Sequence, residues 1–555
     1  MVRYIVTSAL PYVQGIIHLG NLIGSILPAD IYYKYLRMCG EDAIFICGSD
    51  EHGAAIELKA IKEKTTPEAL AEGNHQQIKK LLEQYECTFT IYGRTHTEQN
   101  KGVVYEIFES LYRNGNITKV ESELPYCNTD KRFISDRFIE GKCPVCGYVQ
   151  ARGDQCDSCG NLLEPKELID PYCTICGKKD ITFKKTTNLA LDLVKLQPKI
   201  KEFIEASSTN GWSKNAVHHS LGYIKRGLRP REITRDLKYG FPVPLDGFKD
   251  KLFYVWFDAP IAYIGITKEW DAKKADDYWK GKDTRLVQFM GKDNIEPHTL
   301  IWPGILIGSN LGYILPRTIY AYEYLNWEGE KFSKSRGVGL DIREAIEILP
   351  ADYWRFALAS MLPQSADTDF TLESLKQAID NDMNNVIGNF INRTLTLIKS
   401  NFEGSVPKGK LISEIGTQIE EKTAKYQVNF ERIDIREALR SVVELAGVGN
   451  TLMSSTEPWK LAKSADPADR EKMTDILYSC INIVYKLGIL LHPFTPSASA
   501  EILKTFKSEA KMEFVDRILE SGMKLDIEKV APLFHKLTEE EINKIEQHSG
   551  KRVSR

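Results

Sequence analysis

The fold of this 555-residue chain is decided by the stretch Ser8-Ala9-Leu10-Pro11-Tyr12-Val13-Gln14-Gly15-Ile16-Ile17-His18-Leu19-Gly20-Asn21. It follows an apolar run, Tyr4–Thr7, that predicts a buried strand, and it precedes Leu22–Asp30, which enters a helical pattern. The stretch is therefore a strand-to-helix loop with His18 at its exit. Glycines on both sides of the histidine let a ligand approach the backbone, and the helix start offers N–H groups to an anion. A phosphate would bind well there.

The composition is that of a globular protein with about three or four domains. Hydrophobic residues make up 43% and charged residues 27%, and the net charge of −3 argues against an indiscriminate polyanion binder. A local basic surface for a nucleic acid remains compatible with that charge. Proline, glutamine and glycines interrupt the apolar N-terminal segment, and Pro303 with several glycines interrupts 300–315, so neither predicts a signal peptide or membrane span. We expect a cytoplasmic protein.

Apolar runs alternate with helical patterns in two parts of the chain. The first part contains the runs Tyr4–Thr7, Ala43–Cys47 and Thr88–Tyr92. The second contains Leu252–Phe257, Leu286–Met290 and Thr318–Tyr322. This order predicts an α/β fold with one doubly wound parallel, Rossmann-like sheet, interrupted by an insertion. Ligands of such sheets bind beyond the carboxyl ends of the strands, so Asp50, Glu51 and His52 either contact a substrate or cap the next helix.

Seven of the eleven cysteines lie between Cys127 and Cys176, in pairs that suit metal binding rather than disulfides. Four of them have the zinc-knuckle spacing C-x2-C-x9-C-x2-C: Cys143, Cys146, Cys156 and Cys159. Four thiolates can close a tetrahedron around Zn2+ and leave no open position, so we expect a structural site. A looser set has three thiolates and one carboxylate: Cys127, Asp130, Cys173 and Cys176. This set either holds a second zinc ion or remains metal-free.

Beyond about residue 380 the strand patterns end, and apolar residues recur at helical spacing. The helical segments are Asp382–Ser400, Ile435–Met453, Met473–Leu491 and Pro496–Phe506. The sequence thus predicts an all-α helical-bundle domain followed by a polar, frayed tail. We expect the α/β halves at 1–117 and 226–328, the insertion at 118–225, a connecting region at 329–380, the helical domain at 381–540 and the tail at 541–555.

A second motif lies about 313 residues after His18, in Glu330-Lys331-Phe332-Ser333-Lys334-Ser335-Arg336-Gly337-Val338-Gly339. A lysine-rich loop read alone is usually a solvated loop. Together, however, the two motifs resemble those of class I aminoacyl-tRNA synthetases. His18–Asn21 is similar to the family's His-Ile-Gly-His signature, and Lys331–Ser335 is similar to its Lys-Met-Ser-Lys-Ser loop. Asn21 replaces the second histidine, which keeps a hydrogen-bond donor and removes any proton-transfer role.

Further segments resemble the methionyl-tRNA synthetase family over nearly the whole chain. They are Ala9–Tyr12, Cys47–Gly53, Tyr254–Pro260, Phe289–Asp293 and the cysteine-rich insertion. The resemblance implies an enzyme that forms methionyl-adenylate from ATP and L-methionine. It then esterifies the 3′-terminal adenosine of tRNA(Met). The region 329–380 would hold the Lys-Phe-Ser-Lys-Ser loop and contact the tRNA stem.

The resemblance also implies site residues. Asp50 would pair with the α-ammonium of methionine, in a pocket formed by Leu10, Tyr12, Trp256, Ala259, Pro260, Tyr263, His298, Ile301 and Trp302. ATP would be bound by His18, Gly20, Asn21, Gly291, Asp293, Lys331, Ser333, Lys334 and Ser335, of which His18, Asn21, Lys331 and Lys334 would be catalytic. Arg235 and Asp236 would lie at the rim. Asn389, Arg393 and Trp459 would read the CAU anticodon, although read alone they form a helix-packing cluster.

The implied chemistry is attack of the methionine carboxylate on the α-phosphorus of ATP. Catalysis would then be mainly orientation and neutralisation of charge on the phosphates, with Mg2+ bridging the pyrophosphate. The pocket residues agree with this, because a thioether suits aromatic walls and an ammonium suits a carboxylate. We expect a monomer, with a separate tRNA-binding protein as an optional partner.

Three alternatives stay open at this stage. A class I synthetase for another aliphatic amino acid would need an editing domain, for which the insertion leaves little room, because one methylene discriminates only ~10- to 200-fold. A small nucleotidyltransferase would not need the second motif or the helical domain. A zinc-knuckle RNA-binding protein without catalysis would leave both ATP-loop motifs unexplained.

Overall fold

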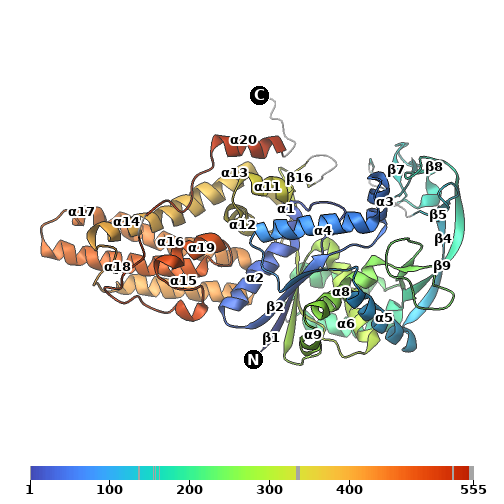
Figure 1. Cartoon of the computed structure of the whole chain (residues 1–555), viewed down its shortest axis with the longest axis horizontal. Helices are drawn as coiled ribbons and strands as arrows, with labels where there is room; N and C mark the ends of the chain where they lie inside the picture. The colour runs from blue at the N-terminus through green and yellow to red at the C-terminus, as the bar shows by residue number, and fades with distance from the viewer. Residues whose placement is uncertain are drawn as a thin grey trace.

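The computed structural model describes residues 2–134, 138–153, 156, 158–159, 161, 163–209, 211–332, 338–527 and 530–548. Figure 1 shows an elongated molecule with an α/β part at one end and a helical domain at the other. The central sheet is parallel and has the order β14-β13-β1-β2-β3. Its strands are β1 (Arg3–Ser8), β2 (Asp42–Ser49), β3 (Ile91–Arg94), β13 (Thr284–Gly291) and β14 (Pro316–Tyr322). The predicted doubly wound sheet is confirmed, and its order reverses between β1 and β13, where a crevice opens at the carboxyl ends.

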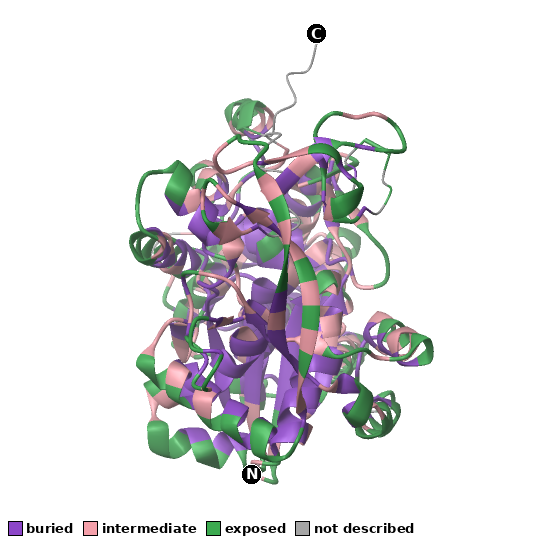
Figure 2. Ribbon diagram, turned by 90° about the vertical axis from the view of Figure 1, so that its right-hand side faces the viewer, coloured by how far each residue is buried: buried purple, intermediate pink, exposed green. Residues whose placement is uncertain are grey.

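Neighbouring strand residues face opposite layers of helices, as the two-residue period of a strand requires. Val6 and Phe45 pack into a core with α2 (Leu27–Met38) and α4 (Pro67–Gln84), whereas Ile5 packs on the other side. That second layer contains α5 (Glu98–Arg113), α8 (Val255–Trp270), α9 (Ala272–Trp279) and α10 (Trp302–Ser309). Figure 2 shows the sheet strands as buried and the outer helices with exposed faces. The sheet is therefore covered on both faces.

The cysteine-rich insertion begins and ends on a long antiparallel ribbon. Its strands β4 (Ile117–Cys127) and β9 (Ile181–Leu191) pair over their full length. Beyond the ribbon lie the short strands β5 (Arg132–Phe133), β6 (Ile139–Lys142), β7 (Ala151–Arg152) and β8 (Ile169–Cys173). After the ribbon, α6 (Leu193–Ser207) and α7 (Lys214–Arg226) bury their apolar faces in the core around α10. Residues 193–225, expected within the insertion, therefore pack as part of the α/β body.

One predicted strand was wrong. The run Leu252–Phe257 was expected to join the parallel sheet, but only β12 (Leu252–Phe253) is extended, and it pairs antiparallel with β11 (Thr234–Arg235). Helix α8 begins at Val255, so Trp256 and Asp258 lie in its first turn rather than after a strand. Every residue of the run is apolar, and an apolar run without a clear period does not distinguish a strand from a buried helix. The expected strand Thr88–Tyr92 is also displaced, since β3 spans Ile91–Arg94.

The connecting region forms a small sheet and short helices. The sheet has the order β16-β15-β17, with β15 (Leu325–Trp327), β16 (Glu330–Lys331) and β17 (Thr368–Phe370). The helices are α11 (Ile342–Ile348), α12 (Ala351–Ser360) and α13 (Leu372–Lys376). A π-helix, η7 (Gln377–Gly388), continues directly into α14 (Asn389–Asn401), so one rod leads from this region into the helical domain.

The helical domain is confirmed as all-α over the described residues. It contains α14, α15 (Ser413–Glu431), α16 (Ile435–Thr456), α17 (Pro458–Leu461), α18 (Pro467–Leu490) and α19 (Pro496–Thr505). By length and composition α18 alone among the described helices could cross a membrane, but 89% of its most apolar window is buried in this bundle. The expected frayed tail differs as well: α20 (Glu539–His548) is helical and buries Ile545. Residues 549–555 of that tail lie outside the described residues.

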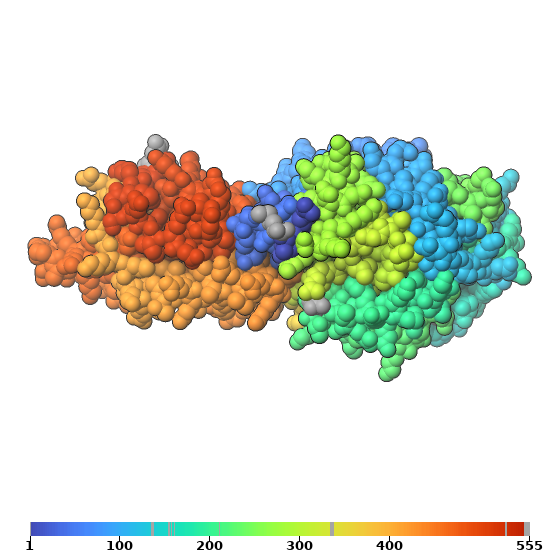
Figure 3. Space-filling model, turned by 90° about the horizontal axis from the view of Figure 1, so that it is seen from below, coloured from blue at the N-terminus to red at the C-terminus, as the bar shows by residue number. Residues whose placement is uncertain are grey.

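A buried ion network joins the α/β part to the helical domain. The Arg355 guanidinium on α12 donates to the carbonyls of Tyr85 (3.0 Å), Pro493 (2.6 Å) and Phe494 (3.1 Å) and pairs with Asp30 at 2.7 Å. Figure 3 shows early residues of the chain, in blue, lying against the helical domain in orange and red. Segments from three parts of the chain therefore meet on one buried cation.

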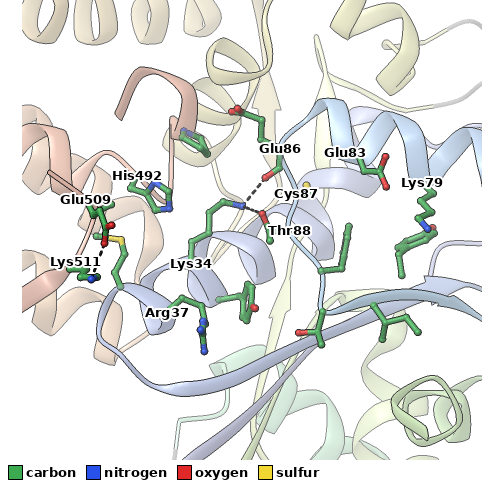
Figure 4. A pocket seen from close by; sticks show the side chains of 18 residues that line it. Lys34, Arg37, Lys79, Glu83, Glu86, Cys87, Thr88, His492, Glu509 and Lys511 are labelled. Carbon is green, nitrogen blue, oxygen red and sulfur yellow. Dashed lines mark hydrogen bonds and ion pairs between the residues drawn. The ribbon is translucent and has the colours of Figure 1, made fainter. Parts of the chain in front are cut away.

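Beside this network lies a cavity of about 880 Å3 lined from both parts of the chain. In Figure 4, Lys34 donates to the carbonyl of Glu86 (2.7 Å) and to the hydroxyl of Thr88 (3.1 Å), with His492 and the Glu509–Lys511 ion pair opposite. Its lining includes both signs of charge, from Lys34, Arg37, Lys79 and Lys511 and from Glu83, Glu86 and Glu509. The cavity therefore marks the seam between the two parts.

Candidate active site

The loop after β1 ends on a helix cap that orients both of its polar residues. The backbone N–H of Asn21 donates to Nδ1 of His18, and the backbone N–H of His18 donates to Oδ1 of Asn21, each at 3.2 Å. Because Nδ1 accepts, a neutral His18 carries its proton on Nε2. Nε2 is then the atom that can donate to a phosphate oxygen. The π-helix η1 (Leu22–Ile26) follows α1 (Leu19–Asn21), so the helix N-terminus points at the same place.

The second motif lies directly against the first. The rings of His18 and Phe332 are stacked, with centroids 4.9 Å apart and planes at 14°. Backbone hydrogen bonds keep this register, from Leu19 N–H to the Leu340 carbonyl (3.1 Å) and from Ile342 N–H to the Ile17 carbonyl (3.0 Å). The two motifs are thus brought together as the sequence predicts. A Cβ at Gly20 would be crowded, because it would lie 3.0 Å from the His18 ring and 3.1 Å from Phe332.

Of the run Lys331–Ser335 in the second motif, the structure describes Lys331 and Phe332. Ser333, Lys334 and Ser335 lie outside the described residues. Lys331 is exposed on β16, with Nζ 5.2 Å from the ring centre of Tyr324. The structure therefore places the base of this loop beside His18.

Asp50 follows β2 and is buried against the first loop. Its N–H donates to the Pro11 carbonyl (2.9 Å), and Val13 N–H donates to the Asp50 carbonyl (3.1 Å). The side chain is only 5% exposed, and its Oδ1 has no hydrogen-bond partner among the described residues. Burial, followed by the charge of Asp258, raises the pKa of Asp50 well above its usual range. A buried carboxylate with one unpartnered oxygen is suited to bind a cation.

Aromatic and apolar residues from three elements converge near Asp50. The loop after β1 supplies Leu10 and Tyr12, and α8 supplies Trp256, Ala259, Pro260 and Tyr263. The π-helix η5 (Pro297–Ile301) supplies His298 and Ile301, and Trp302 begins α10. Tyr12 is 44% exposed, whereas Trp302 is fully buried. The set therefore includes a solvent-exposed side chain, Tyr12, as well as fully buried ones.

A hydrogen-bonded pair forms one wall of this group. The Tyr263 hydroxyl lies 2.9 Å from Nε2 of His298 and 3.3 Å from the Ser8 carbonyl, and Nδ1 of His298 lies 3.0 Å from the Asn294 carbonyl. Burial lowers the pKa of His298 to about 4, so the imidazole is neutral near pH 7. A neutral ring bonded to a carbonyl through Nδ1 leaves Nε2 as an acceptor for the Tyr263 hydroxyl. This wall is uncharged and suits an apolar side chain.

The strand beside β1 ends in the residues expected to contact ribose. Gly291 ends β13, and Asp293 follows in a short 3-10 helix, η4 (Lys292–Asn294). A Cβ on Gly291 would lie 2.7 Å from Oδ1 of Asp293, so this carboxylate folds over the glycine backbone. Lys292 points elsewhere, to Glu323 (2.8 Å) and Asp367 (2.5 Å). At the rim, Lys251 pairs with Asp236 at 2.8 Å, and Arg235 lies 4.8 Å from the ring centre of Tyr254.

Two clusters in the insertion could each hold a metal ion. In the first, Sγ atoms of Cys143 and Cys159 lie 3.9 Å apart, and those of Cys146 and Cys156 lie 3.6 Å apart. The second cluster groups Cys127, Asp130, Cys173 and Cys176, with Oδ2 of Asp130 3.4 Å from Cys127 Sγ and 3.3 Å from Cys173 Sγ. In each cluster all four ligand atoms lie within 4.8 Å of one another. Both sets fit a tetrahedral ion such as Zn2+, because thiolates are its preferred ligands.

At the far end of the helical domain, Arg393 lies over the ring of Trp459, 4.9 Å from its centre. Arg393 is on α14 and Trp459 on α17, so the two helices place them together. Asn389 begins α14 and is exposed, with its amide donating to Asn385 at 3.4 Å. In Figure 1, α17 lies at the opposite end of the molecule from β7 and β8 of the insertion. This group is thus remote from the sheet crevice.

Sequence reasoning missed several functional candidates. No role was predicted for Asp258 or for His96. In the structure both contact the buried His52, which lies two residues after Asp50. A buried acid in the first turn of an apolar helix was the available signal. Arg355 offered no signal, because its partners are backbone carbonyls and a distant carboxylate.

Comparison with known proteins gives a consistent result along the whole chain. A family model described as "tRNA synthetases class I (M)" matches residues 4–395, and one described as "Anticodon binding domain of methionyl tRNA ligase" matches residues 405–553. The methionine–tRNA ligase of Ignicoccus hospitalis is 40% identical over 554 residues, covering 99% of this chain and 97% of that protein. The methionine–tRNA ligase of Aeropyrum pernix is 40% identical over 563 residues, with the same coverage.

Among solved structures, the fold is similar to that of Mycobacterium tuberculosis methionyl-tRNA synthetase in complex with methionyl-adenylate. The TM-score is 0.81 at 23% identity, covering 96% of this chain and 100% of that one. At this identity the likeness concerns the fold alone.

Proposed function

The chain belongs to the methionine–tRNA ligase family of class I tRNA synthetases, and we infer from this that it activates L-methionine with ATP and transfers it to tRNA(Met). The observation that carries the inference is the stacking of Phe332 on His18 at the crevice of the sheet. It brings the two ATP-loop motifs to one place, at the end of a loop whose first part is hydrogen-bonded to the backbone of a buried acid, Asp50. A binding module without catalysis has no use for this arrangement.

For the amino acid, we propose that Asp50 pairs with the α-ammonium. The thioether would be surrounded by the nine residues that converge near Asp50, namely Leu10, Tyr12, Trp256, Ala259, Pro260, Tyr263, His298, Ile301 and Trp302. The neutral His298–Tyr263 wall supports this, because it offers polarity without charge to a thioether sulfur. Leucine, isoleucine and valine lack that sulfur. Selectivity for methionine would then come from this wall and from the shape of the pocket rather than from a separate editing domain.

For ATP, we propose that Nε2–H of His18 and the Asn21 amide donate to phosphate oxygens, with Gly20 allowing close approach. Lys331 and Lys334, with Ser333 and Ser335, would clamp the leaving pyrophosphate, and Gly291 with Asp293 would hold the ribose. Bound with ATP, Mg2+ would supply charge neutralisation on the phosphates. The protein groups hold the methionine carboxylate in line with the α-phosphorus, so catalysis is mainly orientation and electrostatics.

Other parts of the chain have proposed roles away from the chemistry. Both cysteine clusters would hold structural Zn2+, and Asn389, Arg393 and Trp459 would read the anticodon by hydrogen bonding and stacking. We propose the same six segments that the sequence predicts, namely 1–117, 118–225, 226–328, 329–380, 381–540 and 541–555. Within the second segment, residues 193–225 pack on the α/β body. We further propose a cytoplasmic monomer, with a separate tRNA-binding protein as an optional partner; light scattering after size-exclusion chromatography tests the oligomeric state.

Amino-acid-dependent exchange of pyrophosphate into ATP tests the proposed function. We expect exchange with L-methionine and at least about 100-fold lower kcat/KM with leucine, isoleucine or valine, the scale on which pocket contacts discriminate. Charging of tRNA(Met) transcripts then tests the second step. Exchange with another aliphatic amino acid instead of methionine would support the alternative synthetase, and no exchange with any amino acid would support an RNA-binding protein.

A further inference from the structure

A buried chain of three polar side chains lies directly behind Asp50. Nδ1 of His52 contacts Oδ2 of Asp258, and Nε2 of His52 lies 2.7 Å from Nδ1 of His96. His52 is 2% exposed and Asp258 is fully buried, whereas His96 is half-buried and ends the chain near the surface. His52 belongs to the loop that begins with Asp50. Asp258 belongs to the first turns of α8, which also carry Trp256 and Ala259.

Aromatic rings fix the orientation of both imidazoles. The rings of Tyr239 and Phe241 lie edge-on to His52, with centroids at 5.4 and 4.8 Å. The same two rings stack on His96 at 4.9 and 5.4 Å. The histidines therefore cannot turn without disturbing the packing around them. A carboxylate only accepts hydrogen bonds, so Nδ1–H of His52 is the donor to an ionised Asp258.

Among the described residues, neither Asp50 nor Asp258 pairs with a lysine or arginine, and the partner of Asp258 is His52. Oδ1 of Asp50 and Oδ1 of Asp258 have no hydrogen-bond partner in the described part of the chain. The charge of Asp258 contributes to the raised pKa of Asp50, which places the two groups within electrostatic reach. Two buried carboxyl groups that each keep one oxygen without a hydrogen-bond partner are costly, and a cation between the loop and α8 would offset that cost.

We propose that His52 is a positioning residue for amino-acid recognition, holding Asp258 on α8 so that its charge reinforces Asp50 in binding the α-ammonium of the substrate. The role rests on the proposed function, since it concerns the ammonium of an amino acid. The role concerns the charge beside the ammonium. Trp256, at the start of α8, has its own contacts, with Tyr254 (5.8 Å between ring centres) and with Arg231 (4.2 Å from the ring centre).

The two nitrogens of His52 can be tested separately. In His52→Asn the amide lies near the place of Nδ1 and keeps a donor for Asp258, whereas in His52→Gln it reaches toward the place of Nε2 and His96. We expect His52→Gln to raise the KM for methionine and the Ki of L-methioninol by about 10- to 100-fold, the effect of losing a hydrogen bond to a charged group. His52→Asn should stay within about threefold of wild type. The KM for ATP should stay within about twofold in both.

An inhibitor without the amino group separates charge from packing. 4-(Methylthio)butan-1-ol is L-methioninol without its ammonium, so its Ki should be the same in His52→Gln and wild type. Asp258→Asn, which keeps the shape of the side chain and removes its charge, should raise the Ki of L-methioninol alone. If His52→Gln does not fold, this variant carries the test. His75→Gln is the control, because His75 is equally buried but contacts Ser49 Oγ at 2.9 Å.

Equal effects of His52→Asn and His52→Gln, or equal effects on the charged and neutral inhibitors, would overturn the proposal and leave His52 a packing residue. So would an unchanged Ki of L-methioninol in Asp258→Asn. Failure of the proposed function would look different, because the wild-type protein itself would then show no methionine-dependent exchange.

Discussion

Replacing Arg355 by methionine should separate the two halves of the molecule without touching either ligand site. Arg355 is fully buried, and its donors reach three backbone carbonyls and the Asp30 carboxylate. Methionine fills much of the volume but leaves those carbonyls without a donor. Each unsatisfied buried acceptor costs about 1 to 3 kcal/mol, and breaking a buried ion pair costs about 3 to 5 kcal/mol. Because Lys34 still pairs with Asp30, we take the lower range and expect a loss of about 3 to 5 kcal/mol in unfolding free energy.

Urea unfolding followed by fluorescence and circular dichroism measures that loss, and the two half-reactions measure its effect on function. The carbonyls of Pro493 and Phe494 belong to the helical domain, so Arg355→Met should loosen that domain against the sheet. We expect pyrophosphate exchange within about threefold of wild type, because the sheet crevice is unchanged. For tRNA charging we expect kcat/KM to fall by more than about tenfold, which corresponds to a loss of about 1.4 kcal/mol in transition-state stabilisation.

The matched control is Arg440→Met on α16, whose side chain is 66% exposed and pairs with Glu437 and Glu444. It should cost less than about 1 kcal/mol, as exposed ion pairs do. If Arg355→Met cost no more than this control, or reduced exchange as much as charging, the reasoning about the junction would be refuted.

Three further predictions concern pH, tRNA and metal. Burial, together with nearby Glu86, raises the pKa of Asp352 to about 7, so its contribution to stability is present below pH 4 and is lost as the pH rises through 7. Asp352→Asn should therefore gain about 2 to 4 kcal/mol over wild type at pH 8 and much less at pH 5 in urea unfolding, and a pH-independent difference would contradict this. Trp459→Ala should weaken tRNA charging by about 1 to 3 kcal/mol and leave methionine activation unchanged; equal losses in both would make the group structural. Elemental analysis should find two zinc ions per chain, falling to one in Cys146→Ser, and a metal-free active enzyme would exclude both sites.

The elements predicted well are those whose signal is local. The strands β1, β2, β13 and β14 combine apolar runs with polar residues at their ends, and the long bundle helices have a clear period of their own. The strand predicted at Leu252–Phe257 was wrong because every residue of the run is apolar, so no alternation of apolar and polar residues distinguishes a strand from a helix. Helix α15 (Ser413–Glu431) was missed since its apolar face is narrow and polar residues dominate the rest.

The parts of the site that could not be predicted depend on contacts between distant residues. His18 and Phe332 could be paired because both lie in motifs with a known order. Asp258 and His52 are 206 residues apart and carry no motif that links them. The same holds for Arg355, whose acceptors are mainly carbonyls that any sequence would offer. Pairings of this kind follow from the packing of helices and loops, which local periodicity does not specify.

The replacement of the second signature histidine by Asn21 has a physical explanation in the helix cap. The reciprocal bonds with His18 need a residue three positions after the cap that has both a backbone donor and a short acceptor side chain, and asparagine supplies both. Asparagine is shorter than histidine, so its oxygen can turn back to the His18 N–H while its amide nitrogen faces outward as a donor. The other bond of the pair runs from the backbone N–H of residue 21 to Nδ1 of His18, and any residue except proline can donate it, so it favours the same tautomer of His18 whichever side chain stands there. The Asn21 side chain therefore acts on the cap, by holding the backbone of His18, rather than on the His18 ring.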